Sequence, residues 1–206
     1  MIHGWFHVHD GLSAAARFPG RAGSRPRVSA VDVLLLLACG AAAAAAVGFV
    51  RLGLRIPGHA IVLAALPMAF GLSLAPRRFA GSVMSAGALG TGLLLAAGGD
   101  ASYGSGSVVS LALLGPAMDV ALRGARTGGL VYVGLVMAGV GANLLALGSR
   151  AGAKLLGLDL AGARPFDSWW LQAAATYTLS GVVAGLLGAL CWFHFSHRSA
   201  PPRTQA

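Results

Sequence analysis

The sequence contains very few charged residues. Only 10% of its 206 residues are Asp, Glu, Lys or Arg, and just six of these are acidic. Soluble domains contain about 25% charged residues, so this composition excludes an ordinary water-soluble domain. Hydrophobic residues make up 56% of the chain. They form long runs without charges, which is the pattern of membrane-spanning helices.

Several motifs are also missing. There is no G-x-x-x-x-G-K-[ST] sequence, so ATP binding would require a separate chain. There is no G-x-S-G motif, which disfavours an intramembrane hydrolase built on Ser105 or Ser107 with His59. The two cysteines, Cys39 and Cys191, are far apart in apolar runs and are expected to be packing residues. We therefore predict a protein that is not an enzyme.

Six apolar runs are present, each close to the ~20 residues that a helix needs to cross a bilayer. They cover about 30–50, 57–76, 79–98, 105–122, 127–149 and 169–193. No apolar segment that could serve as a cleavable signal precedes Val31, so the first span is expected to direct its own insertion. The predicted fold is an all-α, polytopic bundle of about six helices over 30–194, with tails at 1–29 and 195–206.

The basic residues flank the apolar runs and predict the orientation. With the N-terminus inside, ten basic residues fall in cytoplasmic segments and five in outer loops. The net charge of +9 is therefore interpreted as a topology signal, with no nucleic-acid partner. Both termini are predicted to be cytoplasmic. Because Ala, Gly, Arg and Pro are abundant, as in proteins of GC-rich bacteria, we expect a bacterial inner membrane.

Small residues recur at four-residue spacing in three of the runs. In membranes, helices associate through such stripes because the backbones can approach closely. Pro67 and Pro116 lie inside spans and should leave backbone carbonyls free, as kinks or as sites where a polar group is tolerated. The stripes are Ala38, Ala42 and Ala46; Gly134, Ala138 and Ala142; and Gly181 and Gly185.

Polar residues within or next to the runs fall at one predicted depth, near the outer surface. Such groups are costly in a membrane, so their convergence predicts an outward-facing polar pocket. The candidate substrate-binding residues are His59, Asp100, Tyr103, Ser107, Asn143 and Gln172. Alternatively, His59 is simply interfacial, and Asn143 and Gln172 form interhelical hydrogen bonds. Trp169 and Trp170 are typical of an interfacial aromatic belt.

Two further groups have polar side chains. Asp119, near the inner end of its span, is expected to form an ion pair with Arg77, Arg78 or Arg123, with a coupling role as the alternative. The N-terminus, "MIHGWFHVHDG", has an amine followed by His3, an arrangement that suits square-planar Cu(II) or Ni(II). His7 and His9 could add ligands, although such tails are often inert.

Two stretches resemble the CbiM/NikM group, the substrate-binding membrane (S) components of energy-coupling-factor importers for cobalt and nickel. Gly58-His59, before a proline-containing span, resembles the group's Gly-His metal-ligand position. The segment "GGDASYGSGSVVSLALLGPAMD", residues 98–119, resembles its Gly-Asp, glycine-rich loop and later Gly-Pro. Serines at Ser107 and Ser110 stand where the group would have an asparagine, so the identity of the metal does not follow.

The resemblance implies a function and its partners. It implies Co(II) or Ni(II) as substrate with His59 as a ligand, and a separate ATPase and transmembrane coupling subunit. The stripe of Ala38, Ala42 and Ala46 would dock the coupling subunit. The leading hypothesis is thus an importer's binding component for a transition-metal ion or small solute. The alternative is a non-transporting membrane subunit that binds other helices and whose polar pocket is closed by its own hydrogen bonds.

Overall fold

The computed structural model describes residues 29–50, 58–75, 79–99, 101, 103–125, 127–157 and 166–198. These residues form six helices and no strand. The helices are α2 (Ala30–Phe49), α3 (Ala60–Leu74), α4 (Ala80–Ala97), α5 (Ser105–Gly124), α6 (Gly128–Leu155) and α7 (Phe166–Arg198). The predicted all-α class is confirmed, and each helix coincides with one of the six apolar runs.

Five of the helices are long and apolar enough to cross a membrane, which makes the chain an all-α polytopic membrane protein. The exception is α3, for which the sequence predicted a full span over 57–76. The described helix has 15 residues, or about 22 Å at 1.5 Å per residue, which is less than the hydrocarbon thickness of about 30 Å. In contrast, α6 and α7 continue to Leu155 and Arg198, beyond their predicted ends.

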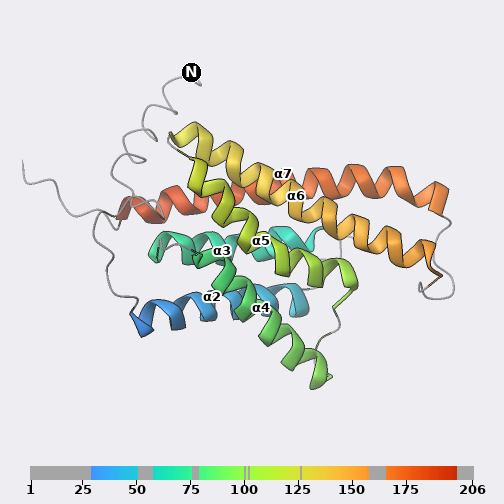
Figure 1. Cartoon of the computed structure of the whole chain (residues 1–206), viewed down its shortest axis with the longest axis horizontal. Helices are drawn as coiled ribbons and strands as arrows, with labels where there is room; N and C mark the ends of the chain where they lie inside the picture. The colour runs from blue at the N-terminus through green and yellow to red at the C-terminus, as the bar shows by residue number, and fades with distance from the viewer. Residues whose placement is uncertain are drawn as a thin grey trace, which may run out of the picture.

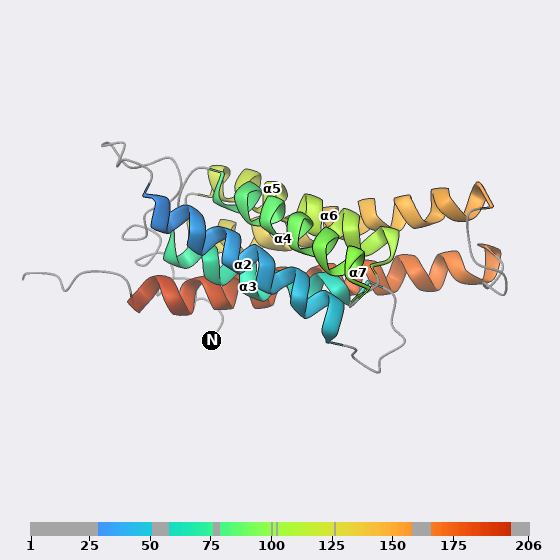
Figure 2. The ribbon, with the colours of Figure 1, turned by 90° about the horizontal axis from the view of Figure 1, so that it is seen from below.

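The short helix α3 lies at the centre of the bundle. It is the one described helix that contacts all five others. At one end of the bundle α2, α4 and α6 end, while α3, α5 and α7 begin; we call this the distal end, and the opposite one the proximal end. The hairpin of α6 and α7 projects past the other helices at the distal end (Figures 1 and 2).

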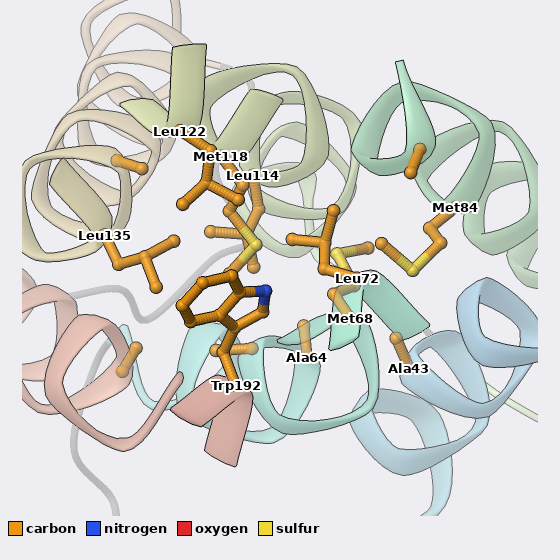
Figure 3. Close-up of a cluster of buried hydrophobic side chains, with 14 of the residues drawn as sticks. Ala43, Ala64, Met68, Leu72, Met84, Leu114, Met118, Leu122, Leu135 and Trp192 are labelled. Carbon is orange, nitrogen blue, oxygen red and sulfur yellow. The ribbon is translucent and has the colours of Figure 1, made fainter. Parts of the chain in front are cut away.

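The core is formed by large apolar side chains from several helices. The buried indole of Trp192 from α7 lies close to Leu135 of α6, Met118 of α5 and Met68 of α3 (Figure 3). Many leucines and valines on the outer faces are exposed, among them Leu93, Leu94 and Leu171. Such an outward-facing apolar surface suits contact with lipid chains.

Glycines bring several helix pairs into backbone contact. A Cβ atom on Gly115 of α5 would overlap the carbonyl oxygen of Gly81 on α4. Gly181 and Gly185 of α7 lie equally close to the backbone of α6, as their four-residue spacing predicted. The alanine stripe behaves differently, since Ala38 and Ala42 are exposed on α2. Instead, α2 approaches α4 through Gly40, so the prediction that this stripe packs the bundle was wrong.

Pro116 of α5 lies next to a hydrogen-bonding contact with a serine of α4. The hydroxyl of Ser85 on α4 donates to Leu111 O at 2.7 Å and accepts from Gly115 N at 3.2 Å. In a regular α-helix this amide and this carbonyl would bond to each other. The serine hydroxyl thus bonds to both groups, one residue before the proline. A site where a polar group is tolerated is one of the two outcomes that the sequence predicted for this position.

Asp119 joins α5 to the start of α4 at the proximal end. Its buried carboxylate accepts hydrogen bonds from Gly81 N (2.8 Å), Ser82 N (2.8 Å) and Ser82 Oγ (2.7 Å). These are amides of a first helical turn, which lack partners within their own helix. The expected ion pair with Arg123 does not form, because that guanidinium lies 4.7 Å from the ring centroid of Phe79. Arg77 and Arg78 lie outside the described residues.

Candidate functional site

Asn143 of α6 connects three helices at the distal end. The side chain is buried, with 1% of its surface exposed. Its Nδ2 donates to the carbonyl of Tyr177 on α7 at 2.6 Å and to the carbonyl of Gly58, just before α3, at 3.3 Å. The interhelical hydrogen bonds that the sequence offered as one interpretation are therefore present.

The other half of the amide is not satisfied. Among the described residues, no donor reaches Asn143 Oδ1. Rotating the amide would not help, because it would place Oδ1 against two carbonyl oxygens. A buried acceptor without a partner costs about 1–3 kcal/mol, so this one calls for an explanation. The bundle therefore holds a fixed, buried carbonyl oxygen that has no donor among the described residues.

Gly58 is required by the geometry next to Asn143. Its φ of +87° is a left-handed conformation that residues with side chains adopt only at a cost. A Cβ atom here would lie 3.0 Å from the ring of Tyr177 and 3.1 Å from Asn143 Nδ2. The half-buried His59 follows Gly58 directly, just before α3. We call Gly58, His59, Asn143 and Tyr177 the Asn143 layer.

Arg150 lies on the same side of α6, two turns further out. Residues seven apart share a helix face, so Asn143 and Arg150 are aligned along the axis. Arg150 Nη1 donates to the hydroxyl of Tyr177 at 3.3 Å. The arginine's stem fills the space beside Gly106 of α5, where a Cβ atom would lie 2.9 Å from Arg150 Cδ. Tyr177 thus contacts both residues, through its backbone carbonyl and its hydroxyl.

The predicted site residues do not share one environment. Asn143 and His59 belong to this layer, and Ser107 follows Gly106 in the first turn of α5. Gln172 is exposed on α7, five residues before Tyr177 and further out. Asp100 and the N-terminal His3, His7 and His9 lie outside the described residues. The sequence missed Arg150, which its position at a span end identified only as an anchor; its seven-residue spacing from Asn143 was the available signal.

Tyr103 has a different environment, although it lies at the same end. Its hydroxyl donates to the carbonyl of Ala44 on α2 at 2.9 Å. Its ring borders a half-open apolar groove of about 620 Å³ between α4 and α5, with Gly92, Val108 and Leu111 among the lining residues. Tyr103 therefore fastens α2 to the segment before α5.

The side chains that could coordinate a metal ion are relevant to the hypothesis of a metal substrate. Within the described part of the chain, no group of three or more His, Cys, Asp or Glu side chains could hold a metal ion. Transition metals are usually held by several such ligands. A metal at His59 would therefore need ligands from outside the described residues.

The close approach at Gly58 can be tested by substitution. We expect Gly58→Ala to destabilise the protein by about 2 kcal/mol, because an alanine at positive φ is strained and its methyl group would press on Tyr177. Thermal unfolding in detergent micelles would measure this. Gly157→Ala is the matched control, since Gly157 has φ +70° but no atoms near its Cβ position. Equal losses in both variants would show that contact with Tyr177 and Asn143 contributes nothing.

The layer as a whole offers binding groups. A buried acceptor and a guanidinium lie on one face of α6, and Tyr177 of α7 orients both. The acceptor is buried and the guanidinium side chain is exposed, and convergent polar groups are a feature of small-molecule sites. The function has to be argued from these residues, since the chain matches no known protein family, no curated protein and no solved structure.

Proposed function

We propose that this chain is the membrane-embedded binding component of an importer and that it binds a small solute in the Asn143 layer. The observation that supports the proposal is the Oδ1 atom of Asn143, which has no donor among the described residues. The residue is 1% exposed, and its Nδ2 donates two hydrogen bonds that hold the amide in place. A solute with an N–H or O–H group would satisfy this oxygen. Its binding would offset the cost of the orphan acceptor.

The arrangement of charges and helices fits such a role. With the orientation predicted from the arginines, the distal end faces the exterior, where a solute would arrive. A separate ATPase and coupling subunit would supply the energy. The exposed Ala38 and Ala42 on α2 leave a small-residue surface available to a helix of that subunit. A Co(II) or Ni(II) substrate bound through His59 is the metal form of the same proposal.

One observation favours a second candidate, a non-transporting membrane subunit. Asn143 Nδ2, the Tyr103 hydroxyl and the Tyr177 hydroxyl are all engaged in bonds within the bundle. Such bonds strengthen the association of membrane helices by about 0.6–2 kcal/mol each. On this hypothesis the polar layer serves cohesion alone, and no solute binds.

Equilibrium dialysis separates the two candidates. The purified protein in lipid nanodiscs would be dialysed against a water-soluble extract of bacterial cells, and separately against Co(II) and Ni(II), and the bound species identified by mass spectrometry. We expect wild type to enrich a small solute and Asn143→Leu to lose it.

Tyr103→Phe is the matched control, because it removes an interhelical hydrogen bond outside the Asn143 layer. It should bind as wild type does, which separates loss of binding from loss of stability. Binding of Co(II) or Ni(II) that disappears in His59→Ala would establish the metal form. If wild type enriches neither solute nor metal, the importer proposal is wrong and the non-transporting subunit is favoured.

A further inference from the structure

The described charges at the distal end are basic. Arg150 and Lys154 project from α6 there, and Lys154 lies 5.4 Å from the ring centroid of Trp169. The aspartates whose side chains the structure describes are Asp32, in the first turn of α2, and Asp119. Both lie at the proximal end. Arg150 and Lys154 are therefore the described groups at this end that could bind an anion.

Arg150 has unused donors. Its guanidinium has five N–H groups, and its one described polar contact is with the Tyr177 hydroxyl. Among the described residues, no carboxylate forms an ion pair with it. A guanidinium presents a planar fork that matches carboxylate and phosphate oxygens. The bond to Tyr177 and the packing of its stem against Gly106 hold this fork near the layer.

The spacing of the two groups defines the shape of a ligand. Seven residues separate Asn143 and Arg150 on α6, so they lie about 10 Å apart along the helix axis at 1.5 Å per residue. Asn143 Oδ1 accepts a hydrogen bond, and Arg150 donates several. A ligand that satisfies both would carry an oxyanion at its outer end and a donor at its buried end.

We infer that the solute is a small oxyanion, a carboxylate or phosphate, whose opposite end carries an N–H or O–H group. Arg150 binds the oxyanion and Asn143 Oδ1 accepts from the donor. This inference rests on the proposed function, since it names the substrate class of the same site. It also assigns Arg150, which the sequence marked only as an anchor, as a ligand-binding residue.

The test uses the same nanodiscs and cell extract with a second set of variants. We expect wild type to enrich a solute with a carboxylate or phosphate, and the mass spectrum to distinguish the two. Arg150→Gln should weaken binding of that solute about tenfold or more, since it removes the charge-assisted hydrogen bonds. Arg150→Lys should restore part of the affinity. Lys154→Gln removes an equal charge one turn away but no hydrogen bond to the oxyanion, so it should weaken binding much less than Arg150→Gln does.

Chemical variants of the recovered solute complete the experiment. Its neutral amide or ester should bind wild type about tenfold more weakly, and Arg150→Gln should not distinguish the two forms. Recovery of a neutral or cationic solute, or a solute whose binding is unchanged in Arg150→Gln, would overturn the inference and leave the importer proposal intact. Recovery of bound Co(II) or Ni(II) without a solute would overturn the inference alone, and recovery of neither would overturn both.

Discussion

Replacing Asp119 with asparagine should destabilise the protein by about 3 kcal/mol, even though the two side chains have the same shape. The carboxylate accepts three hydrogen bonds from the start of α4. Bonds to charged groups are worth about 1.5–3 kcal/mol each. An asparagine would keep one acceptor, and its NH2 group would face a second donor. The charge that stabilises the N-terminus of α4 would also be lost.

Thermal unfolding in detergent micelles would measure the effect, with Asp32→Asn as the control. Asp32 lies in the first turn of α2, also at the proximal end. Its replacement removes the same charge from a helix start and should cost about 1 kcal/mol or less. If both variants lose the same stability, the three bonds to α4 contribute no more than Asp32 contributes at the start of α2, and the cap is unimportant.

Asp119 also illustrates what a sequence leaves out. Its depth in the span was predictable, and so was its need for a partner. The nearby arginines were the obvious candidates. The actual partners are backbone amides, which every residue has, so no pattern distinguishes Gly81 and Ser82 as donors. The αL conformation of Phe79, which begins α4 without a side-chain cap of its own, is likewise visible only in three dimensions.

Most of the fold was predictable because hydrophobicity alone marks a membrane span. All six described helices coincide with apolar runs, and their boundaries mostly agree within a few residues. The exception is α3. Its apolar run is similar to the others in length and composition, but its helix begins only after Gly58, which is in the left-handed conformation. Its central position depends on contacts with five helices, which no local pattern contains.

The candidate site was predictable in position but not in detail. Topology placed Asn143 and His59 at one end, and the structure brings both to the layer that contains Gly58. Which atoms of Asn143 are bonded depends on the carbonyls of two other helices. The sequence therefore could not show that Oδ1 has no donor among the described residues. Arg150 was overlooked because a basic residue at a span end is normally an anchor.

The second large effect is expected at the contact between α6 and α7. Gly185→Ala should destabilise the protein by about 2–3 kcal/mol, because the added methyl group would press on backbone that cannot move independently. A Cβ atom at Gly185 would lie 2.6 Å from both Leu135 O and Val136 N. The two helices would have to separate, and lipid offers no hydrophobic compensation for the lost contacts.

Gly188→Ala, three residues further along α7, is the matched control. Its Cβ atom would meet Ala69 Cβ at 3.7 Å and Met118 Cε at 3.8 Å, which are ordinary contacts. Since alanine favours helix by about 1 kcal/mol over glycine, this variant should unfold at the same temperature as wild type or slightly higher. The two glycines look alike in the sequence, so opposite effects of one substitution would show that packing against α6 determines the result. A Gly185→Ala variant as stable as Gly188→Ala would mean that α6 and α7 do not pack at this distance.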